Sequence, residues 1–192
     1  MKKKMALALG GVALVATLAI GGTLAYFTDT DAAANVFTMG KVGIDLTEDS
    51  DSDKVVEITE DGITYDDIVP GDVVSKRPTI SVDEDSQDCY VAAIIEVSAS
   101  SEDLDVSEVS FDVDTTKWTL VNGVYYYNEK LSANDSVDLF TETTIPTGWE
   151  NEFAGQTFTV AIKAYAIQAE NVSLVNEDGS VNEWVNDENF GD

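Results

Sequence analysis

Hydrophobic and polar positions alternate along this chain in short blocks that predict β-strands. Residues 156–168 place Phe158, Val160 and Ile162 on one face and polar side chains on the other. A period of two residues is typical of a strand with one buried face. Residues 89–98 are almost all apolar or β-branched, which indicates a strand covered on both faces. No block repeats with the period of a long helix.

Turn residues separate these blocks at hairpin spacing. Asn122-Gly123 lies between two apolar segments, and this pair suits the two positive φ values of a type I′ turn. Residues 55–59 and 63–65 predict the two strands of a second hairpin. Pro78 lies inside the predicted strand 73–83, so we expect this strand at a sheet edge or a bulge, because proline cannot donate to a ladder.

Eight or nine strands of this kind predict an all-β fold, an antiparallel two-sheet sandwich of jelly-roll or Ig-like type with at most short helical turns. The segment 171–192 is acidic, with Trp184 and Phe190 isolated in it. We expect it to form a short appended element or a mobile end.

The first 25 residues have the layout of a secretory signal peptide. Lys2, Lys3 and Lys4 precede an uncharged apolar run, and small residues end it. We expect cleavage between Ala25 and Tyr26. The run is about as long as a membrane span, so an uncleaved anchor is the alternative. The predicted organisation is a signal peptide (1–25), an N-terminal arm with the first strand (26–46), a β-sandwich domain (47–170) and an acidic C-terminal tail (171–192).

The chain is strongly acidic, with 37 Asp and Glu against ten Lys and Arg. Without the three lysines of the predicted signal, seven basic residues remain and the net charge is −30. Repulsion excludes nucleic acid as a partner, and also electrostatic docking on an anionic membrane. The acidity indicates a soluble secreted protein, or a surface that resists association until calcium or acid screens it.

Histidine is absent from the sequence, which removes the HExxH zinc motif and the Ser-His-Asp triad. Cys89 is the only cysteine, so no internal disulfide can form. It lies in a predicted buried strand with no cationic residue nearby in sequence, which favours a packed thiol over a reactive one. No catalytic residue and no cofactor is predicted.

The acidic segment after residue 46 contains the spacing of a calcium-binding loop. Asp49, Asp51, Asp53 and Glu60 fall at loop positions 1, 3, 5 and 12. Lys54, however, stands where the sharp turn requires glycine, and the flanking segments predict strands instead of helices. A solvated acidic loop is the better interpretation, and no metal site is predicted.

The sequence around the predicted cleavage site, TLAYFTDT followed by NVFTMGKVGIDL, resembles the start of the TasA/camelysin (CalY) family of secreted matrix proteins, which carry a SipW-type signal peptide. The pattern N-x-F-x-x-G-x-V-x-I-x-L is filled here by Asn35, Phe37, Gly40, Val42, Ile44 and Leu46. Further landmarks extend the resemblance to about residue 171: Pro70-Gly71-Asp72, Lys76, Pro78, Tyr90-Val91, the hairpin from Trp118 to Tyr127, Leu139-Phe140, and residues 164–169.

This resemblance implies a jelly-roll-like fold and polymerisation into extracellular fibres, in which the N-terminal segment of one subunit adds as a strand to the next. An apolar free end is physically suited to that role. The candidate donor residues are Tyr26, Phe27, Asn35, Val36 and Phe37. The alternative is that the arm pairs inside its own subunit. The segment Val42, Ile44 and Leu46 is expected in the parent fold.

The predicted partners are other copies of the chain in a homopolymer, the signal peptidase during export, and other matrix proteins, with membrane contact only before cleavage. The predicted location is the extracellular matrix or cell surface. Two alternatives stay open. One is a monomeric module that binds a glycan or host surface, with Tyr125, Tyr126 and Tyr127 available for stacking. The other is a protease, because camelysin-like members have been described as metalloproteases.

Overall fold

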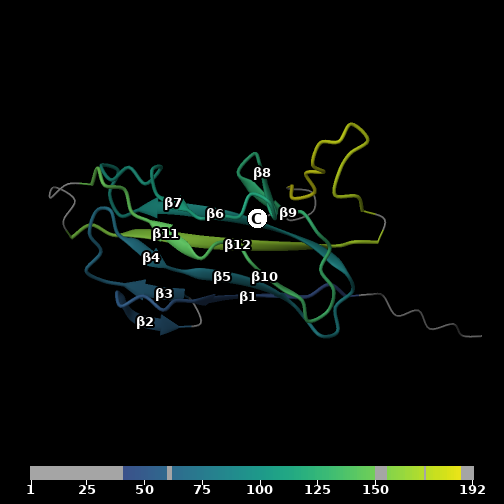
Figure 1. Ribbon diagram of the computed structural model, residues 1–192, viewed down its shortest axis with the longest axis horizontal. Coiled ribbons are helices and arrows are strands. Elements are labelled where there is room, and N and C mark those ends of the chain that lie inside the picture. Colours follow the sequence, from purple (N-terminus) through teal and green to yellow (C-terminus); the bar gives the residue numbers. More distant parts are fainter. Residues whose placement is uncertain (1–40, 60–61, 150–154, 171, 187–192) are drawn as a thin grey trace, which may run out of the picture. The chain divides into compact units, whose positions relative to one another are not determined.

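The computed structural model describes residues 41–59, 62–149, 155–170 and 172–186, all within one compact unit of the chain. These residues contain twelve β-strands and no helix. All strand pairs are antiparallel. The predicted all-β sandwich is confirmed (Figure 1). No helix in the described part of the chain is long and apolar enough to cross a membrane.

One layer of the sandwich consists of two short sheets, and the chain passes directly from one sheet to the other. The first sheet has the order β1-β5-β10 and the second has the order β4-β11-β7. Lys76 alone separates β4 from β5, and its backbone N–H donates to the Thr141 carbonyl across the same break (3.1 Å). The strands are β1 (Ile44–Asp49), β4 (Val73–Ser75), β5 (Arg77–Val82), β7 (Ser110–Phe111), β10 (Ser136–Asp138) and β11 (Glu142–Thr144).

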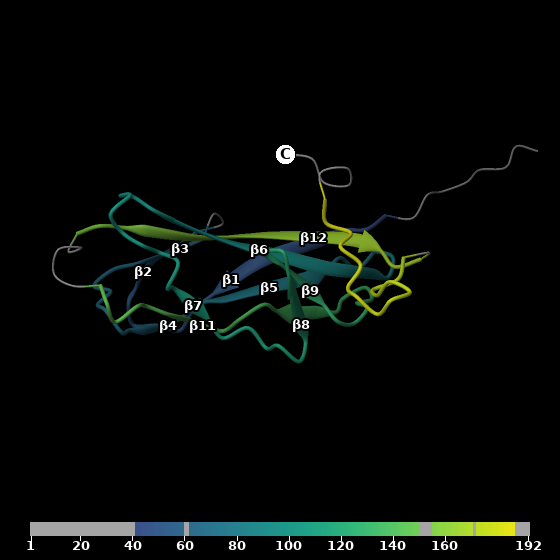
Figure 2. The ribbon, with the colours of Figure 1, turned by 90° about the horizontal axis from the view of Figure 1, so that it is seen from above.

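The other layer is a four-stranded sheet in the order β12-β6-β9-β8. Its strands are β6 (Cys89–Ala99), β8 (Trp118–Val121), β9 (Val124–Tyr127) and β12 (Phe158–Gln168). Strands β6 and β12 pair over their full length, from Phe158 opposite Ala99 to Gln168 opposite Cys89. Figure 2 shows β12 and β6 running above β5 and β1. A two-stranded hairpin of β2 (Val55–Thr59) and β3 (Gly62–Tyr65) completes the described strands.

The predicted hairpin turns explain why the chain reverses where it does. Asn122 and Gly123 have φ values of 50° and 86°, the type I′ conformation that suits a two-residue turn between twisted strands. The resulting β8–β9 pair places Trp118 opposite Tyr127, with ring centroids 5.1 Å apart. The hairpin thus delivers two aromatic side chains to the interior.

The main core lies between the two layers. Ile80 and Val91 are fully buried, and Trp118 is 2% exposed. The Trp118 indole N–H donates to the Asp138 carbonyl (3.1 Å), so its polar group is satisfied in the interior. The buried members of this cluster are Ile80, Val82, Cys89, Val91, Ala93, Trp118, Tyr127, Leu131, Val137, Leu139 and Phe140.

A second, smaller cluster is formed around Ala92, Tyr126 and Trp184. Trp184 comes from the acidic tail and is 4% exposed. An isolated bridge between Val175 and Val181 folds this tail into a short turn. Residues 172–186 therefore form a short appended element; Phe190 lies outside the described residues.

Two strand predictions need correction. The predicted strand 73–83 is divided at Lys76, and Pro78 lies in β5, the central strand of its sheet, not at an edge or bulge. The physical reason is that the β5–β10 ladder ends beside the proline. Asp138 is the last paired residue of β10, and the next N–H, of Leu139, donates to the Pro78 carbonyl (3.0 Å). The proline therefore stands where no further donor is required.

The end of the predicted N-terminal arm and first strand (26–46) belongs to the sandwich. Val42, Ile44 and Leu46 pack against the main core, as expected for them. Strand β1 begins at Ile44 and runs to Asp49, pairing with β5 of its own chain. The first strand is therefore an integral part of the sandwich.

Candidate functional site

A large groove opens between the two layers at one end of the sandwich. Its volume is about 1760 Å³. Strands β1 and β3 line one side, and residues 155–162, which include the first half of β12, line the other. Val74, Lys76, Thr143 and Ile145 from the β4–β11 region also line it.

The walls of the groove come from the inward faces of both layers. In β12, half-buried Phe158, Val160 and Ile162 alternate with exposed residues, as the sequence predicts. In the opposite layer, Val74 and Ile145 are buried. Val160 and Ile162 also pack against the main core, so the groove runs along the border of that core.

Both long strands beside the groove have a free edge. Within the described residues, β1 pairs only with β5, and β12 pairs only with β6. A free edge presents unpaired N–H and C=O groups and can accept another strand. The groove is thus bounded by two strand edges able to add a partner.

The groove also contains a buried ion pair. Lys76 Nζ lies 2.5 Å from Glu48 Oε2, and their side chains are 7% and 16% exposed. Removing two charges from water is costly unless they are paired. The two side chains can meet because Glu48 lies opposite Pro78 in the β1–β5 register, two residues from Lys76.

Two polar atoms that line the same groove lack partners. Within the described part of the chain, the Thr143 hydroxyl oxygen and the Gln156 side-chain oxygen are buried with no hydrogen-bond partner. An unsatisfied buried polar group costs about 1–3 kcal/mol. Such a cost is recovered if an incoming group bonds to these atoms.

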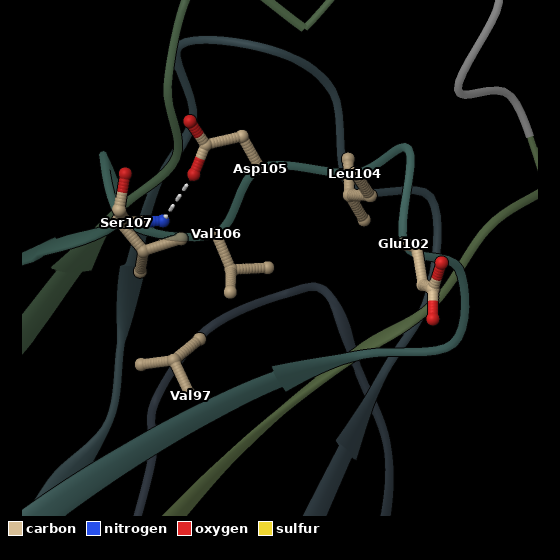
Figure 3. Close-up of a pocket in the computed structure, with 7 residues that line it drawn as sticks. Val97, Glu102, Leu104, Asp105, Val106 and Ser107 are labelled. Atoms are coloured by element: carbon tan, nitrogen blue, oxygen red, sulfur yellow. Dashed lines mark hydrogen bonds between the residues drawn. The ribbon is translucent and has the colours of Figure 1, made fainter.

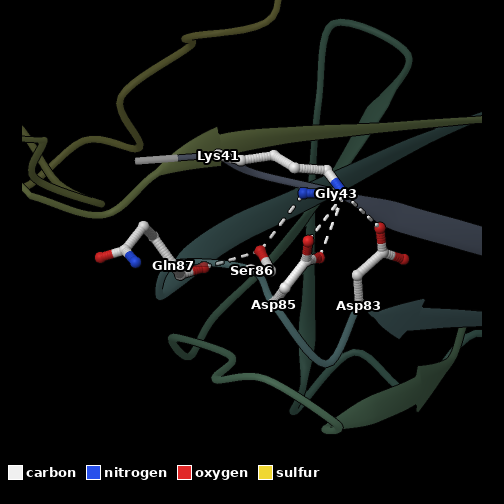
Figure 4. Close-up of polar contacts among 6 residues, drawn as sticks. All are labelled: Lys41, Gly43, Asp83, Asp85, Ser86 and Gln87. Atoms are coloured by element: carbon white, nitrogen blue, oxygen red, sulfur yellow. Dashed lines mark hydrogen bonds and ion pairs between the residues drawn. The ribbon is translucent and has the colours of Figure 1, made fainter. Parts of the chain in front are cut away.

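The described chain begins at a polar clamp formed by residues 41–43 and the 83–87 loop (Figure 4). Lys41 Nζ donates to Asp85 (3.0 Å) and lies 3.5 Å from Asp83. The Lys41 carbonyl accepts from the Gln87 N–H (2.9 Å). Hydrogen bonding to Asp85, and then its charge, raises the pKa of Lys41.

Gly43 allows the close approach of this loop. Its N–H donates to the Ser86 hydroxyl (3.2 Å), and its carbonyl accepts from the Asp83 N–H (3.0 Å). A Cβ atom at this position would lie 2.1 Å from Asp83 Oδ2. The clamp therefore fixes the chain just before it enters β1.

The clamp and the groove lie toward opposite ends of β12. Gln87 of the clamp is next to Asp88, whose carbonyl accepts from the Ala169 N–H, just beyond the last residue of β12. The groove lies along residues 155–162, at the beginning of the same strand. The chain therefore enters the described fold near the last residue of β12, four residues before Asp45, the first residue that lines the groove.

A second, shallower pocket of about 620 Å³ lies beside the end of β6 (Figure 3). Val97 and Leu104 line it together with Glu102 and Asp105. The Asp105 carboxylate accepts from the Ser107 N–H (2.9 Å), and hydrogen bonds from Ser107 lower the pKa of Asp105. This carboxylate therefore stabilises its own loop.

The residues predicted for cleavage and strand donation lie outside the described residues. They are Ala25, Tyr26, Phe27, Asn35, Val36 and Phe37. In the sequence, Lys76 is only one of the family landmarks, and neither Glu48 nor Thr143 is predicted as a site residue. The available signal was the alternation from Val74 to Val82, which places Lys76 in a row of inward-facing positions.

The calcium-loop spacing does not correspond to a metal site in the described part of the chain, where no group of three or more His, Cys, Asp or Glu residues could hold an ion. Asp49 accepts from the Ser50 N–H (2.9 Å) and lies 3.8 Å from Arg77. Hydrogen bonding with Ser75 lowers the pKa of Asp51. Glu60 lies outside the described residues.

The tyrosines proposed for glycan stacking take part in packing. Tyr126 and Tyr127 are 2% and 9% exposed, and half-buried Tyr125 packs against the main core. Cys89 is fully buried, and burial, followed by the charge of Asp88, raises its pKa to about 11. The prediction of a packed thiol is confirmed.

The fold and the groove define an all-β sandwich protein with free strand edges around an open space between its layers. The chain belongs to the camelysin metallo-endopeptidase family, whose sequence profile matches residues 1–113. The TasA/camelysin resemblance is thereby confirmed. No curated protein and no solved structure matches the chain.

The family description implies a catalytic metal, and the residues present do not fit one. Catalytic zinc is held by three protein ligands, usually with histidine among them, and this sequence contains no histidine. Among the carboxylates that line the groove, Glu48 is also committed to its ion pair with Lys76. We derive no metal-dependent step for this chain.

Proposed function

We propose that this protein is a secreted structural subunit that polymerises head to tail into fibres of an extracellular or biofilm matrix. The mature N-terminal arm, beginning at Tyr26 after cleavage, adds as a strand to the next copy. Membership of the camelysin family supports this class of protein. The observation that carries the proposal is the open groove with free strand edges on both sides.

The arm is long enough for this role. Residues 26–40 span about 50 Å when extended, whereas the eight residues 155–162 beside the groove span about 26 Å. Backbone hydrogen bonds to a strand edge supply affinity, and alternate side chains entering the groove supply specificity. Seven residues remain to connect neighbouring subunits.

The direction of the chain favours addition to a second copy. The clamp at Lys41 holds the chain near the last residue of β12, whereas the groove lies along the beginning of that strand. Donating the arm there to the groove of another copy is a head-to-tail contact between different surfaces. Such contacts generate filaments unless the rotation closes a ring.

The proposal is tested by comparing the mature chain that starts at Tyr26 with a shorter chain that starts at Lys41. Size-exclusion chromatography with light scattering, followed by negative-stain microscopy at low and moderate salt, should show elongated assemblies only for the first. If both chains stay monomeric and equally stable, the arm is not a donor strand and the proposal fails.

A point variant separates arm chemistry from arm length. Phe37→Asp in the mature chain places a charge against the apolar part of the groove wall and should abolish elongation. Leu120→Asp is the matched control, because Leu120 is 54% exposed on β8, away from the groove. Equal assembly of both variants would contradict insertion of Phe37.

The family description favours an endopeptidase as the second candidate. We propose that this chain is not one, because it lacks the histidine ligands of such enzymes. Casein incubated with the mature chain, zinc and calcium should stay intact, while a histidine-zinc endopeptidase cleaves it. Cleavage that copurifies with the chain and is lost on chelation would reverse this assignment.

A further inference from the structure

The groove contains polar groups at positions that an ordinary sandwich core would fill with apolar side chains. Buried residues alternate along β4 and β5, from Val74 through Lys76 and Pro78 to Ile80 and Val82. Lys76, 6% exposed, is the charged member of this row. Its ion pair with Glu48 faces the groove and not the sealed part of the core.

Thr143 lies next to this ion pair. It stands opposite Val74 in the β11–β4 register, so Lys76 is its diagonal neighbour on the same face, a spacing of about 7–8 Å in antiparallel pairs. Thr143 is 4% exposed, and its hydroxyl has no partner among the described residues. The Gln156 side-chain oxygen, also unpartnered there, lines the same groove.

We propose that Glu48, Lys76 and Thr143 form an amide socket, which receives the side-chain amide of Asn35 from a second copy and so fixes the register of the inserted strand. The inference rests on the proposed function, and it assigns the residues that align the two copies. Register needs such a device because a slip of one residue would turn every side chain to the opposite face.

An amide has the chemistry that the socket lacks. Lys76 has three N–H donors, of which the carboxylate of Glu48 takes a part, and the Thr143 hydroxyl can also donate. The free oxygen of Gln156 requires a donor. A primary amide offers an acceptor oxygen and two N–H donors. A carboxylate would meet the charge of Glu48 and offer no donor.

The amide must come from another copy because the chain's own Asn35 cannot reach the socket. Glu48 lies seven residues along β1 from the clamped Lys41, about 23 Å. Asn35 precedes Lys41 by six residues, which span about 20 Å when extended. A return to the socket would also require a reversal of the chain. The segment from Asn35 to Lys41 is therefore too short to bring Asn35 to the socket of its own chain.

The arm places an apolar anchor beside the amide. Asn35 and Phe37 are two residues apart and lie on the same face of an extended strand. With Asn35 in the socket, Phe37 meets the apolar groove wall, to which Val160, Ile162 and Ile145 contribute. The polar residue sets the register and the aromatic residue supplies buried area.

Disulfide trapping tests the contact directly in the full mature chain. The variant Asn35→Cys/Thr143→Cys, oxidised after assembly, should give a ladder of covalent multimers on a non-reducing gel. The matched control is Asn35→Cys/Thr115→Cys, because Thr115 is in an exposed loop away from the groove. Native Cys89 is fully buried and should not contribute. A ladder of equal yield in both variants, or none in the first, overturns the socket.

A double-mutant cycle provides a second measurement without new thiols. Asn35→Leu and Thr143→Val should each raise the critical concentration for fibre formation about tenfold, because each leaves a buried polar group unpaired. The combined variant should be less impaired than the product of the two effects, since residues in contact are not additive. Thr115→Val should leave the concentration unchanged.

The outcomes separate the two proposals. A wild-type mature chain that forms no fibres overturns the fibre assignment and the socket together. Fibres that form at the wild-type concentration with Asn35→Leu, or an additive cycle, overturn the socket alone and leave donor-strand assembly standing.

Discussion

The ring of Trp184 lies 5.8 Å from the ring of Tyr126 in an edge-to-face arrangement. Tyr126 belongs to β9, whereas Trp184 comes from the acidic tail. The tail thereby covers a face of the four-stranded sheet that would otherwise expose Tyr126. This cover explains how two aromatic residues far apart in sequence become one buried cluster.

Replacing the tail anchor should weaken the fold measurably. Trp184→Ala is expected to lower the free energy of unfolding by about 3–4 kcal/mol, because it removes a buried aromatic ring and leaves a cavity. Urea denaturation followed by circular dichroism checks this value. Val175→Ala, in the same tail but 52% exposed, should change it by less than about 0.5 kcal/mol. Equal effects would show that Trp184 is not an anchor.

The buried ion pair should behave differently from a surface pair. Lys76→Ala leaves Glu48 buried without its partner and should cost about 3–5 kcal/mol in unfolding free energy. The double replacement Lys76→Met/Glu48→Leu should be close to neutral. The control is Lys163→Ala, whose partner Glu96 is 50% exposed, with an expected loss below about 1 kcal/mol. A double replacement as damaging as Lys76→Ala would contradict this account.

The Cys89 thiol should be unreactive in the folded protein. With its pKa raised to about 11 by burial and by Asp88, about one thiol in a thousand is ionised at pH 8. A thiol reagent at pH 8 should label the native chain at least a hundredfold more slowly than the chain in urea. Comparable rates would mean that Cys89 is accessible and not packed.

Stability should decline in acid through groups such as Asp112. Burial opposes ionisation of this carboxyl, but hydrogen bonds from the Thr141 hydroxyl (2.6 Å) and the Glu142 N–H (2.7 Å) outweigh it and lower its pKa. A lowered folded-state pKa stabilises the fold above the unfolded value of about 3.9, and this contribution is lost as pH falls below it.

The variant Asp112→Asn tests this assignment. Its urea midpoint should lie below that of wild type at pH 7, and the difference should shrink between pH 4 and pH 2. Asp53→Asn, in an exposed loop, should follow the wild-type curve. A constant difference from pH 7 to pH 2 would show that ionisation of Asp112 is not involved.

Local patterns predicted the elements whose causes are local. Asn122-Gly123 located its hairpin because two positive φ values are needed there, and the alternation from Phe158 onward located β12. Pro78 misled because its effect depends on where β10 ends, which is a fact about another segment. The partner of Trp184 could not be predicted for the same reason, since Tyr126 is 58 residues away.

The residues of the groove also depend on contacts between distant segments. Lys76 could be placed on an inward row from its neighbours alone, but Glu48 becomes its partner only through the β1–β5 register. Thr143 becomes notable only because its hydroxyl has no hydrogen-bond partner among the described residues. A site whose residues come from separate segments cannot be predicted from the residue pattern along any one of them.

The interruption at Lys76 has a mechanical consequence. The chain leaves one sheet and joins the next at this residue, and the neighbouring pair β10 and β11 is interrupted at the same level by residues 139–141. Two breaks side by side form a crease across the layer, bridged by the Lys76 N–H to Thr141 bond. The β4–β11–β7 sheet therefore joins the rest of its layer only across this crease, and it contributes Val74 and Thr143 to the lining of the groove.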